Sequence, residues 1–125
     1  MVAAAALGFS TTAASAAVVQ PQKRTVESVQ TRVKERVLHI TTKMRSLQTR
    51  VAANKHFPAA TKAIIQADID KVLDDTAIWR KKVAAATTMA MIRAATPARE
   101  TVMLDMGKLR AHLAAARRTS DPAAE

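Results

Sequence analysis

The chain has 125 residues, room for one small domain, and its alanine-rich, glycine-poor composition favours helix over strand or disorder. The formal net charge is +10, from 20 Lys and Arg residues against 10 Asp and Glu residues. The absence of cysteine excludes disulfide bonds and thiolate metal sites, and the scarcity of aromatic residues requires a core of Val, Ile, Leu, Met and Ala. We therefore predict an all-α domain.

The N-terminal residues have the pattern of a secretory signal peptide. Val2–Phe9 is a short apolar run, and small residues follow it up to a possible cleavage site before Ala17. No Lys or Arg precedes the run, as the basic start of a signal peptide requires, which leaves open whether Met1 is the natural start. A polar, Ala/Ser/Thr-rich tail is the alternative. We predict a signal peptide over 1–16 and a connector over 17–24.

The first predicted helix runs from Thr25 to Ala53. Thr25 is suited to cap its start, and Asn54 to end it, because Asn tolerates the left-handed conformation found at many helix ends. Such a helix would be about 43 Å long, so a partner helix must cover it. Apolar residues recur there at steps of three and four, at Val26, Val29, Val33, Val37, Ile40, Met44, Leu47 and Val51.

The second predicted helix follows a short corner, Asn54–Pro58, and must therefore run antiparallel to the first. Phe57 is expected to seal this corner against the core. The helix is expected to reach about Ala86. Its apolar stripe consists of Ile65, Ile69, Val72, Thr76, Trp79 and Val83, with Trp79 as a core anchor.

The third predicted segment begins at Met89, where Thr88 supplies a cap. Two interpretations of Pro97 remain open: the proline kinks one helix that reaches Arg118, or Thr96 caps a separate helix that begins at Pro97. The stripe continues through Ile92, Ala95, Val102, Met106, Leu109, Leu113 and Ala116.

Together these segments predict an elongated antiparallel three-helix bundle over 25–118. Its third helix is expected to be kinked or broken near Pro97, and 119–125 are expected to form a disordered tail. Gly107 lies inside the third segment and costs helix stability by about 1 kcal/mol relative to Ala. It marks either a close backbone approach or a tolerated defect.

The basic residues are the main functional signal, because a surplus of positive charge attracts polyanions. The first helix is basic, whereas the aspartates of the second helix nearly balance its lysines and arginines. Aromatic residues for base stacking are nearly absent, which argues against sequence-reading nucleic-acid modules. The candidate anion-binding residues are Arg32, Lys34, Arg36, Lys43, Arg45, Arg80, Lys81, Lys82, Arg117 and Arg118.

The methionines are a second candidate site, because thioethers are soft ligands suited to Cu(I). Met89 and Met91 form an M-x-M pair, and Met103 and Met106 form an M-x-x-M pair. Core packing is the competing interpretation, since methionine fills irregular gaps well.

No catalytic constellation is present in the sequence. His39, His56 and His112 lack the spacing that places two ligands on one helix face. Asp70 and Asp74 share a face of the second helix, but nearby basic residues make a charge-balancing role sufficient for them. We therefore predict a non-enzymatic protein without a cofactor.

The stretch from Arg50 to Asp75, continued from Ile78 to Ala95, resembles a loose group of alanine-rich, exported helical proteins of actinobacteria. In those proteins a helix ends in an A-N corner, a second helix carries a Trp followed by basic residues, and an A-A-T-T element opens the third. Members commonly have an acidic residue where this chain has Met91. The resemblance implies export and a helical fold, and it carries no activity.

These features predict an exported protein that binds anionic polymers or lipid headgroups at the cell envelope through its basic helix faces. One alternative is a homo-oligomeric, coiled-coil-like assembly module, whose stripes bury against copies of the chain. Further alternatives are an intracellular protein that associates non-specifically with nucleic acid, and the handling of Cu(I) by the methionines.

Overall fold

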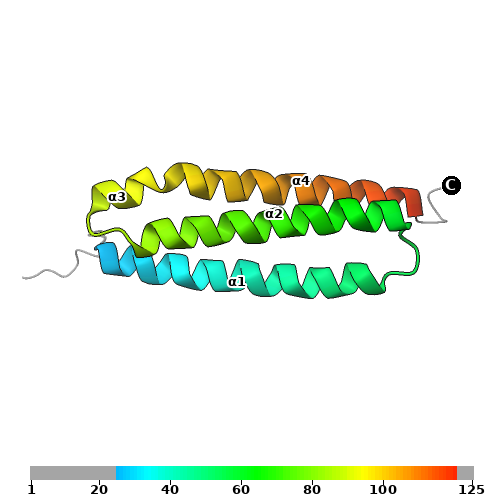
Figure 1. Cartoon of the computed structure of the whole chain (residues 1–125), viewed down its shortest axis with the longest axis horizontal. Coiled ribbons are helices and arrows are strands. Elements are labelled where there is room, and N and C mark those ends of the chain that lie inside the picture. The colour runs from blue at the N-terminus through cyan, green and yellow to red at the C-terminus, as the bar shows by residue number, and fades with distance from the viewer. Residues whose placement is uncertain (1–24, 121–125) are drawn as a thin grey trace, which may run out of the picture.

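The computed structural model describes residues 25–120, and every regular element within this range is an α-helix. The elements are α1 (Val26–Ala53), α2 (Ala59–Ala84), α3 (Met89–Ala94) and α4 (Thr96–Ser120). Figure 1 shows an elongated bundle in which α2 runs back along α1, and the short α3 leads end to end into α4. The predicted all-α, antiparallel three-helix bundle is confirmed. The predicted signal peptide and connector lie outside the described residues.

The start of α1 follows the predicted cap. The Thr25 hydroxyl accepts a hydrogen bond from the Ser28 amide at 3.0 Å, and the Thr25 amide donates to the Ser28 hydroxyl at 3.1 Å. This reciprocal capping box satisfies amide donors that have no partner within the helix. Serine fills the position at which Glu or Gln is more usual.

The corner between α1 and α2 lies where the sequence predicts it, but Asn54 ends α1 by a different mechanism. Its φ of −70° and ψ of 122° are extended, so the predicted left-handed conformation is wrong. The Asn54 side-chain oxygen instead accepts hydrogen bonds from the amides of His56 at 2.7 Å and Phe57 at 3.0 Å. An Asn side chain bonded to the backbone two and three residues on stabilises a tight turn. Phe57 is buried, as predicted, and closes this end of the core.

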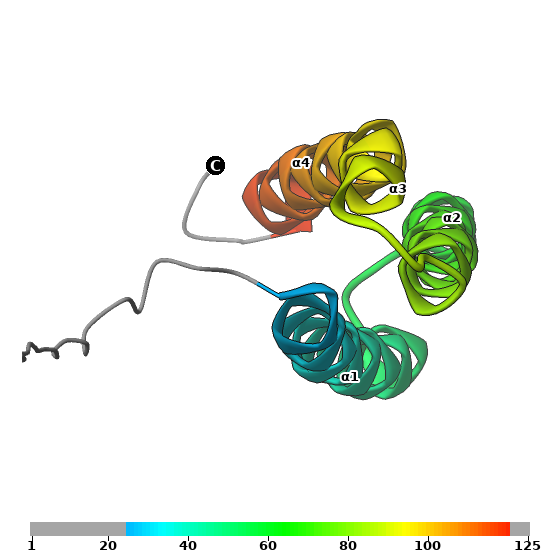
Figure 2. The same ribbon diagram turned by 90° about the vertical axis from the view of Figure 1, so that its left-hand side faces the viewer.

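The core is organised around α2, which packs against both α1 and α4. Every member of its predicted stripe is buried, from Ile65 to Val83. The α1 stripe is buried from Val37 onward, but its first three members, Val26, Val29 and Val33, stay partly exposed. Figure 2 shows that α2 lies against both α1 and α4 on one side of the bundle, and that no other described helix lies over α1 and α4 on the opposite side; Val29 and Val33 line a hollow between α1 and the α3–α4 junction.

The interruption of the third helix lies at Ala95, two residues before Pro97. The Ala95 carbonyl accepts hydrogen bonds from the amides of Ala98 at 3.1 Å and Arg99 at 3.3 Å, which starts the ladder of α4. Thr96 is therefore the first residue of α4 and not its cap, and the predicted kink or break near Pro97 is confirmed as a break at Ala95. Pro97 occupies the first turn, where an amide donor would lack an intrahelical partner in any case.

The ends of the long helices are held by side chains from their neighbours. The Gln30 amide group of α1 donates to the carbonyls of Val83 and Ala86, each at 3.0 Å, just where α2 ends. Lys62 of α2 donates to the Ala52 carbonyl at 3.0 Å, at the end of α1. These bonds add side-chain donors to carbonyl groups at the helix ends, and they fix the register of the two helices.

Two boundaries differ from the predictions. α2 ends at Ala84 rather than at about Ala86, and α4 continues to Ser120 instead of giving way to a tail at residue 119. A β-carbon at Gly107 would meet no atom within 4 Å, so this glycine is a helix defect and not a point of close approach. Among residues 25–120, no helix has the length and hydropathy needed to cross a membrane.

Candidate functional site

Two hollows lie between α1 and α4, on the side of the bundle that α2 does not cover. We call the strip of surface that contains both hollows the seam. The larger hollow, of about 620 Å³, lies at the end of the bundle near α3. Its apolar lining comes from all four helices or their junctions: Val29, Val33, Trp79, Val83, Ile92 and Ala95. Arg32, Arg36 and Arg99 line it as well, together with Glu35 and Thr96.

The smaller hollow, of about 220 Å³, lies further along the seam, towards the C-terminal ends of α1 and α4. Its apolar lining consists of Met44, Leu47, Met106, Leu109 and Leu113. Its basic lining consists of Lys43, Arg50, Arg110 and Arg117. Between the two hollows the core is closed, because Ile40 and Val102 are almost fully buried.

The seam is strongly basic along both of its edges. Four basic residues come from α1 (Arg32, Arg36, Lys43 and Arg50) and three from α4 (Arg99, Arg110 and Arg117), and we call these seven side chains the rim. All seven are exposed, and Glu35 is the one acidic residue that lines either hollow. Within the part of the chain that the structure describes, no rim residue forms a salt bridge. Their charge is therefore available to a partner.

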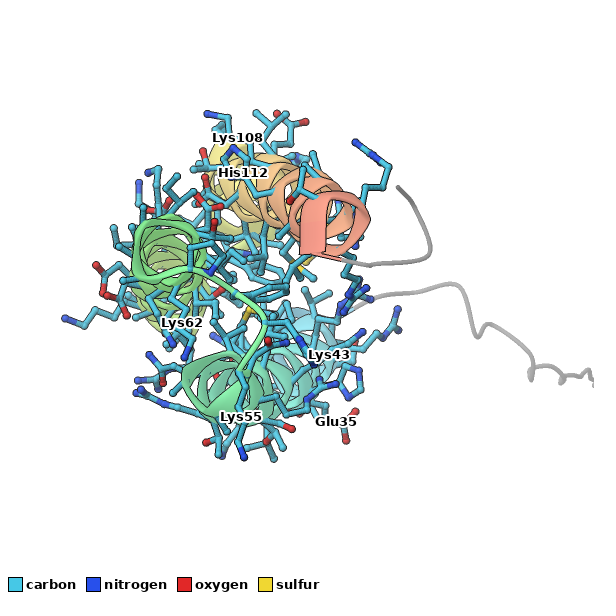
Figure 3. The ribbon with its side chains drawn as sticks, turned by 90° about the vertical axis from the view of Figure 1, so that its right-hand side faces the viewer. Glu35, Lys43, Lys55, Lys62, Lys108 and His112 are labelled. Atoms are coloured by element: carbon cyan, nitrogen blue, oxygen red, sulfur yellow. The ribbon has the colours of Figure 1, made fainter. Side chains whose placement is uncertain are left out.

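The five aspartates among the described residues lie on α2 and at its contact with α4, outside the lining of the seam. Lys71 and Asp75 form an ion pair at 3.0 Å, and Lys71 lies 4.0 Å from Asp105 of α4. His112 of α4 contacts the Asp68 carboxylate. In Figure 3, Lys43 projects from α1 on the side towards α4, whereas His112 and Lys108 project from the other side of α4. The bundle thus separates a mixed-charge α2–α4 face from a basic seam.

Asp105 is a buried carboxyl group at the α2–α4 contact, with an exposed fraction of 5%. Burial raises its pKa to about 6, and a hydrogen bond and charge repulsion from Asp75 add to the increase. The pKa of Asp75 is lowered, first through its hydrogen bond to Asp105. Below about pH 6 the pair therefore holds a proton, on Asp105. One Asp105 oxygen has no hydrogen-bond partner.

The structure divides the predicted anion-binding residues among four places. Arg32, Arg36, Lys43 and Arg117 belong to the rim. Lys34 and Arg45 lie on α1 outside the seam lining, and Arg80–Lys82 occupy the last turns of α2. Arg118 is exposed in the last turn of α4.

Sequence reasoning missed three rim residues, Arg50, Arg99 and Arg110, and the buried Asp105. Arg99 carries a signal in the sequence, because it occupies an apolar position of the third stripe. Arg50 and Arg110 carry none on their own, since only the spacing between α1 and α4 makes them face the same hollow.

The methionines of the Cu(I) hypothesis lie in two separate groups. Met103 and Met106 are half-buried against the core, whereas the Met91 sulfur accepts hydrogen bonds from the Thr87 amide at 3.5 Å and hydroxyl at 3.4 Å. Because α3 and α4 follow one another end to end, Met91 and Met103 are about 18 Å apart along the helix axis. The fold therefore does not bring all four sulfurs around one ion.

The imidazole and carboxylate groups do not assemble a metal site among residues 25–120. Asp70 accepts a hydrogen bond from the Gln48 side chain at 3.3 Å, and Asp74 is exposed. His39 and His56 are exposed on α1 and in the corner that follows it.

No protein-family model, curated protein or solved structure matches the chain. The resemblance to exported actinobacterial proteins accordingly stays a prediction, and the seam is interpreted from its own geometry.

Proposed function

We propose that this chain is a non-enzymatic binding protein that contacts an anionic partner through the seam. The export-like sequence of residues 1–16 supports a place at the cell envelope, where anionic polymers and lipid headgroups are abundant. The +10 charge supplies long-range attraction, and the rim supplies the contact surface.

The observation that carries the proposal is the segregation of charge. The ion pairs among the described residues lie at the α2–α4 contact, where Lys71 pairs with Asp75 and His112 contacts the Asp68 carboxylate, whereas the seven rim residues line hollows that contain one carboxylate, Glu35. Basic side chains that converge on a hollow produce a stronger local potential than the same charges spread over a convex surface. The rim is therefore the surface at which an anion is bound best.

The experiment measures binding of the full chain to dextran sulfate, to vesicles of phosphatidylglycerol and phosphatidylcholine, and to duplex DNA, at low and high salt. We expect binding to dextran sulfate that weakens as salt rises, because binding releases counterions. The double variant R32E/R36E should weaken it by about tenfold, since two reversals change several charge contacts that are each worth a few tenths of a kcal/mol.

The matched control is K34E/R45E, which changes the net charge equally on the same helix but outside the seam lining. We expect it to weaken binding by less than about threefold, through the general field alone. Equal losses in the two variants would remove the seam from the proposal, and no binding to any of the three anions at low salt would remove the proposal itself.

A second candidate function is assembly of copies of this chain. Leu38 is 67% exposed and Leu104 is 69% exposed, so α1 and α4 each present a large apolar side chain to solvent. Such residues are suited to contacts between copies. Sedimentation of the full chain tests this function: a species that stays monomeric at high protein concentration would contradict it.

A further inference from the structure

We infer that the occupant of the seam is an acidic amphipathic helix from a partner protein, which would complete a four-helix arrangement. The inference rests on the proposed function and names the class of anion that the seam takes. Three properties of the seam carry it: an apolar floor, a concave and open shape, and basic charge on both edges.

The floor of the seam is apolar and incompletely covered. Val29, Val33 and Ile92 are each partly exposed, although they belong to the stripes that face the core. Burial of apolar surface stabilises an association by about 25 cal/mol for each Å². A partner that carries only charge, such as a sulfated or phosphorylated polymer, would leave this floor in contact with water.

The shape of the seam favours a helix over a flat or a small partner. A lipid surface meets a protein as a plane, and it would touch the rim without reaching the floor of a concave hollow. A small molecule needs a site that buries most of its surface, whereas the larger hollow is open to solvent along one side. A helix in a groove keeps its outer face hydrated while its apolar face is covered.

The length of the seam matches a helix of ordinary size. From Val29 to Arg50 the lining of α1 extends about 32 Å, and a helix of about 20 residues covers that distance. The basic residues of α1 and of α4 form two parallel rows, because both helices run in the same direction (Figure 1). An occupant with Asp or Glu on both flanks of an apolar stripe would meet both rows.

Charge or length excludes the other occupants that the chain itself offers. Residues 121–125 carry Asp121 and Glu125, but five residues span at most about 18 Å, which is less than the length of the seam. Residues 1–24 contain no Asp or Glu, so this segment cannot complement the rim. A second copy that docked seam to seam would place rim against rim, and like charges in such an interface are unfavourable. An acidic segment of another protein is the occupant that fits both the floor and the rim.

The experiment uses the fluorescence of Trp79, the one tryptophan of the chain, which lines the floor of the larger hollow. The probe is a synthetic peptide of about 20 residues, with leucine at helical spacing and glutamate on both flanks. A scrambled peptide of the same composition, whose leucines do not share a face, is its control. We expect the amphipathic peptide to shift Trp79 emission and to bind at least tenfold more tightly than the scrambled one.

Two variants separate the floor from the rim. V29Q/I92Q makes the floor polar at two partly exposed positions, and it should weaken binding of the amphipathic peptide by about tenfold and binding of dextran sulfate by much less, because the charges of the rim are unchanged. R32E/R36E should weaken both. Circular dichroism checks that each variant keeps the helical content of the parent chain.

Equal affinity for the two peptides, or a V29Q/I92Q variant that binds the amphipathic peptide as well as the parent, would overturn the inference and leave the proposed function intact. Tighter binding of lipid vesicles than of the amphipathic peptide would overturn it in favour of a membrane partner. Failure of the parent chain to bind the two peptides, dextran sulfate, the vesicles and duplex DNA at low salt would overturn both the inference and the proposed function.

Discussion

Asp105 has the largest effect on the pH dependence expected of this fold. Its pKa is raised to about 6, so between pH 3.8 and about 6 the folded chain binds a proton that the unfolded chain has released. The stability contributed by this proton is fully present below pH 3.8, and it is lost as the pH rises through about 6. The carboxyl group is thus well accommodated only when it is protonated and bonded to Asp75.

The variant Asp105→Asn tests this account, because an amide is neutral at every pH and can still donate to Asp75. We expect the variant to be more stable than the parent at pH 7.5, by roughly 1 to 3 kcal/mol, and to lose the advantage at pH 4. Urea denaturation at both pH values measures the difference in the free energy of unfolding between the variant and the parent. The charge repulsion of a basic protein is common to both chains and cancels in this difference. An advantage of equal size at both pH values would contradict the pKa assignment.

Gly107 is a second residue at which the structure makes a specific prediction. It is exposed within α4, and a β-carbon there would meet no atom within 4 Å. The variant Gly107→Ala should therefore raise the free energy of unfolding by about 0.5 to 1 kcal/mol, mainly because it reduces the freedom of the unfolded chain. Thermal denaturation measures it, and a destabilised variant would show that α4 requires the flexibility of glycine.

Single-residue predictions from the sequence succeeded where one local interaction decides the outcome. Thr25 and Thr88 cap helices because their hydroxyl groups reach amides only three residues away. Asn54 ended its helix as predicted, but through its side chain rather than its backbone. Asp105 escaped notice because its burial and its raised pKa depend on the packing of α4 against α2, where Asp75 and Lys71 lie about 30 residues earlier in the chain.

At the scale of the elements, the junction of α3 and α4 shows what the apolar periodicity of a sequence can and cannot predict. The apolar phase passes through Pro97 without a break, so the pattern alone does not distinguish a kink from an end. The structure places the end at Ala95, where its amide bonds to the Ile92 carbonyl and closes α3. α4 then begins with Pro97 in its first turn, a position at which proline is compatible with a helix.

The variant Pro97→Ala should consequently change the free energy of unfolding by less than about 1 kcal/mol. The matched comparison is Ala111→Pro, at an exposed position inside the same helix, which should cost about 3 kcal/mol or more because it removes a bond and clashes with the preceding turn. Chemical denaturation measures both. Similar losses in the two variants would mean that Pro97 does not lie at a helix start.

The stripes of the long helices were predictable because one apolar side chain every three or four residues admits a single helical interpretation. All six stripe residues of α2 are buried, which reflects its position against two partners. The partial exposure of Val26, Val29 and Val33 was not predictable, since these residues continue the stripe of α1 without any change of pattern. Their exposure depends on how far α1 lies from α4. The packing of the whole bundle sets this separation, and the pattern of a single helix does not contain it.

At the scale of the whole molecule, the net charge matters less than its distribution. The fold places Asp68, Asp75 and Asp105 at the α2–α4 contact, and it lines the hollows of the seam with seven basic residues and one acidic residue, Glu35. Sequence identified the basic character of α1, but it could not show that α1 and α4 share a concave face. The seam is therefore a product of the fold, and it gives a basic protein one preferred place to bind an anion.

The measurement that tests this claim most directly is mapping of backbone amide chemical shifts by NMR while dextran sulfate is added to the full chain. We predict that the largest changes fall on the rim, at Arg32, Arg36, Arg99 and Arg110, and that they diminish as salt rises. Changes centred on Arg80–Lys82, or spread evenly over all basic residues, would contradict the account.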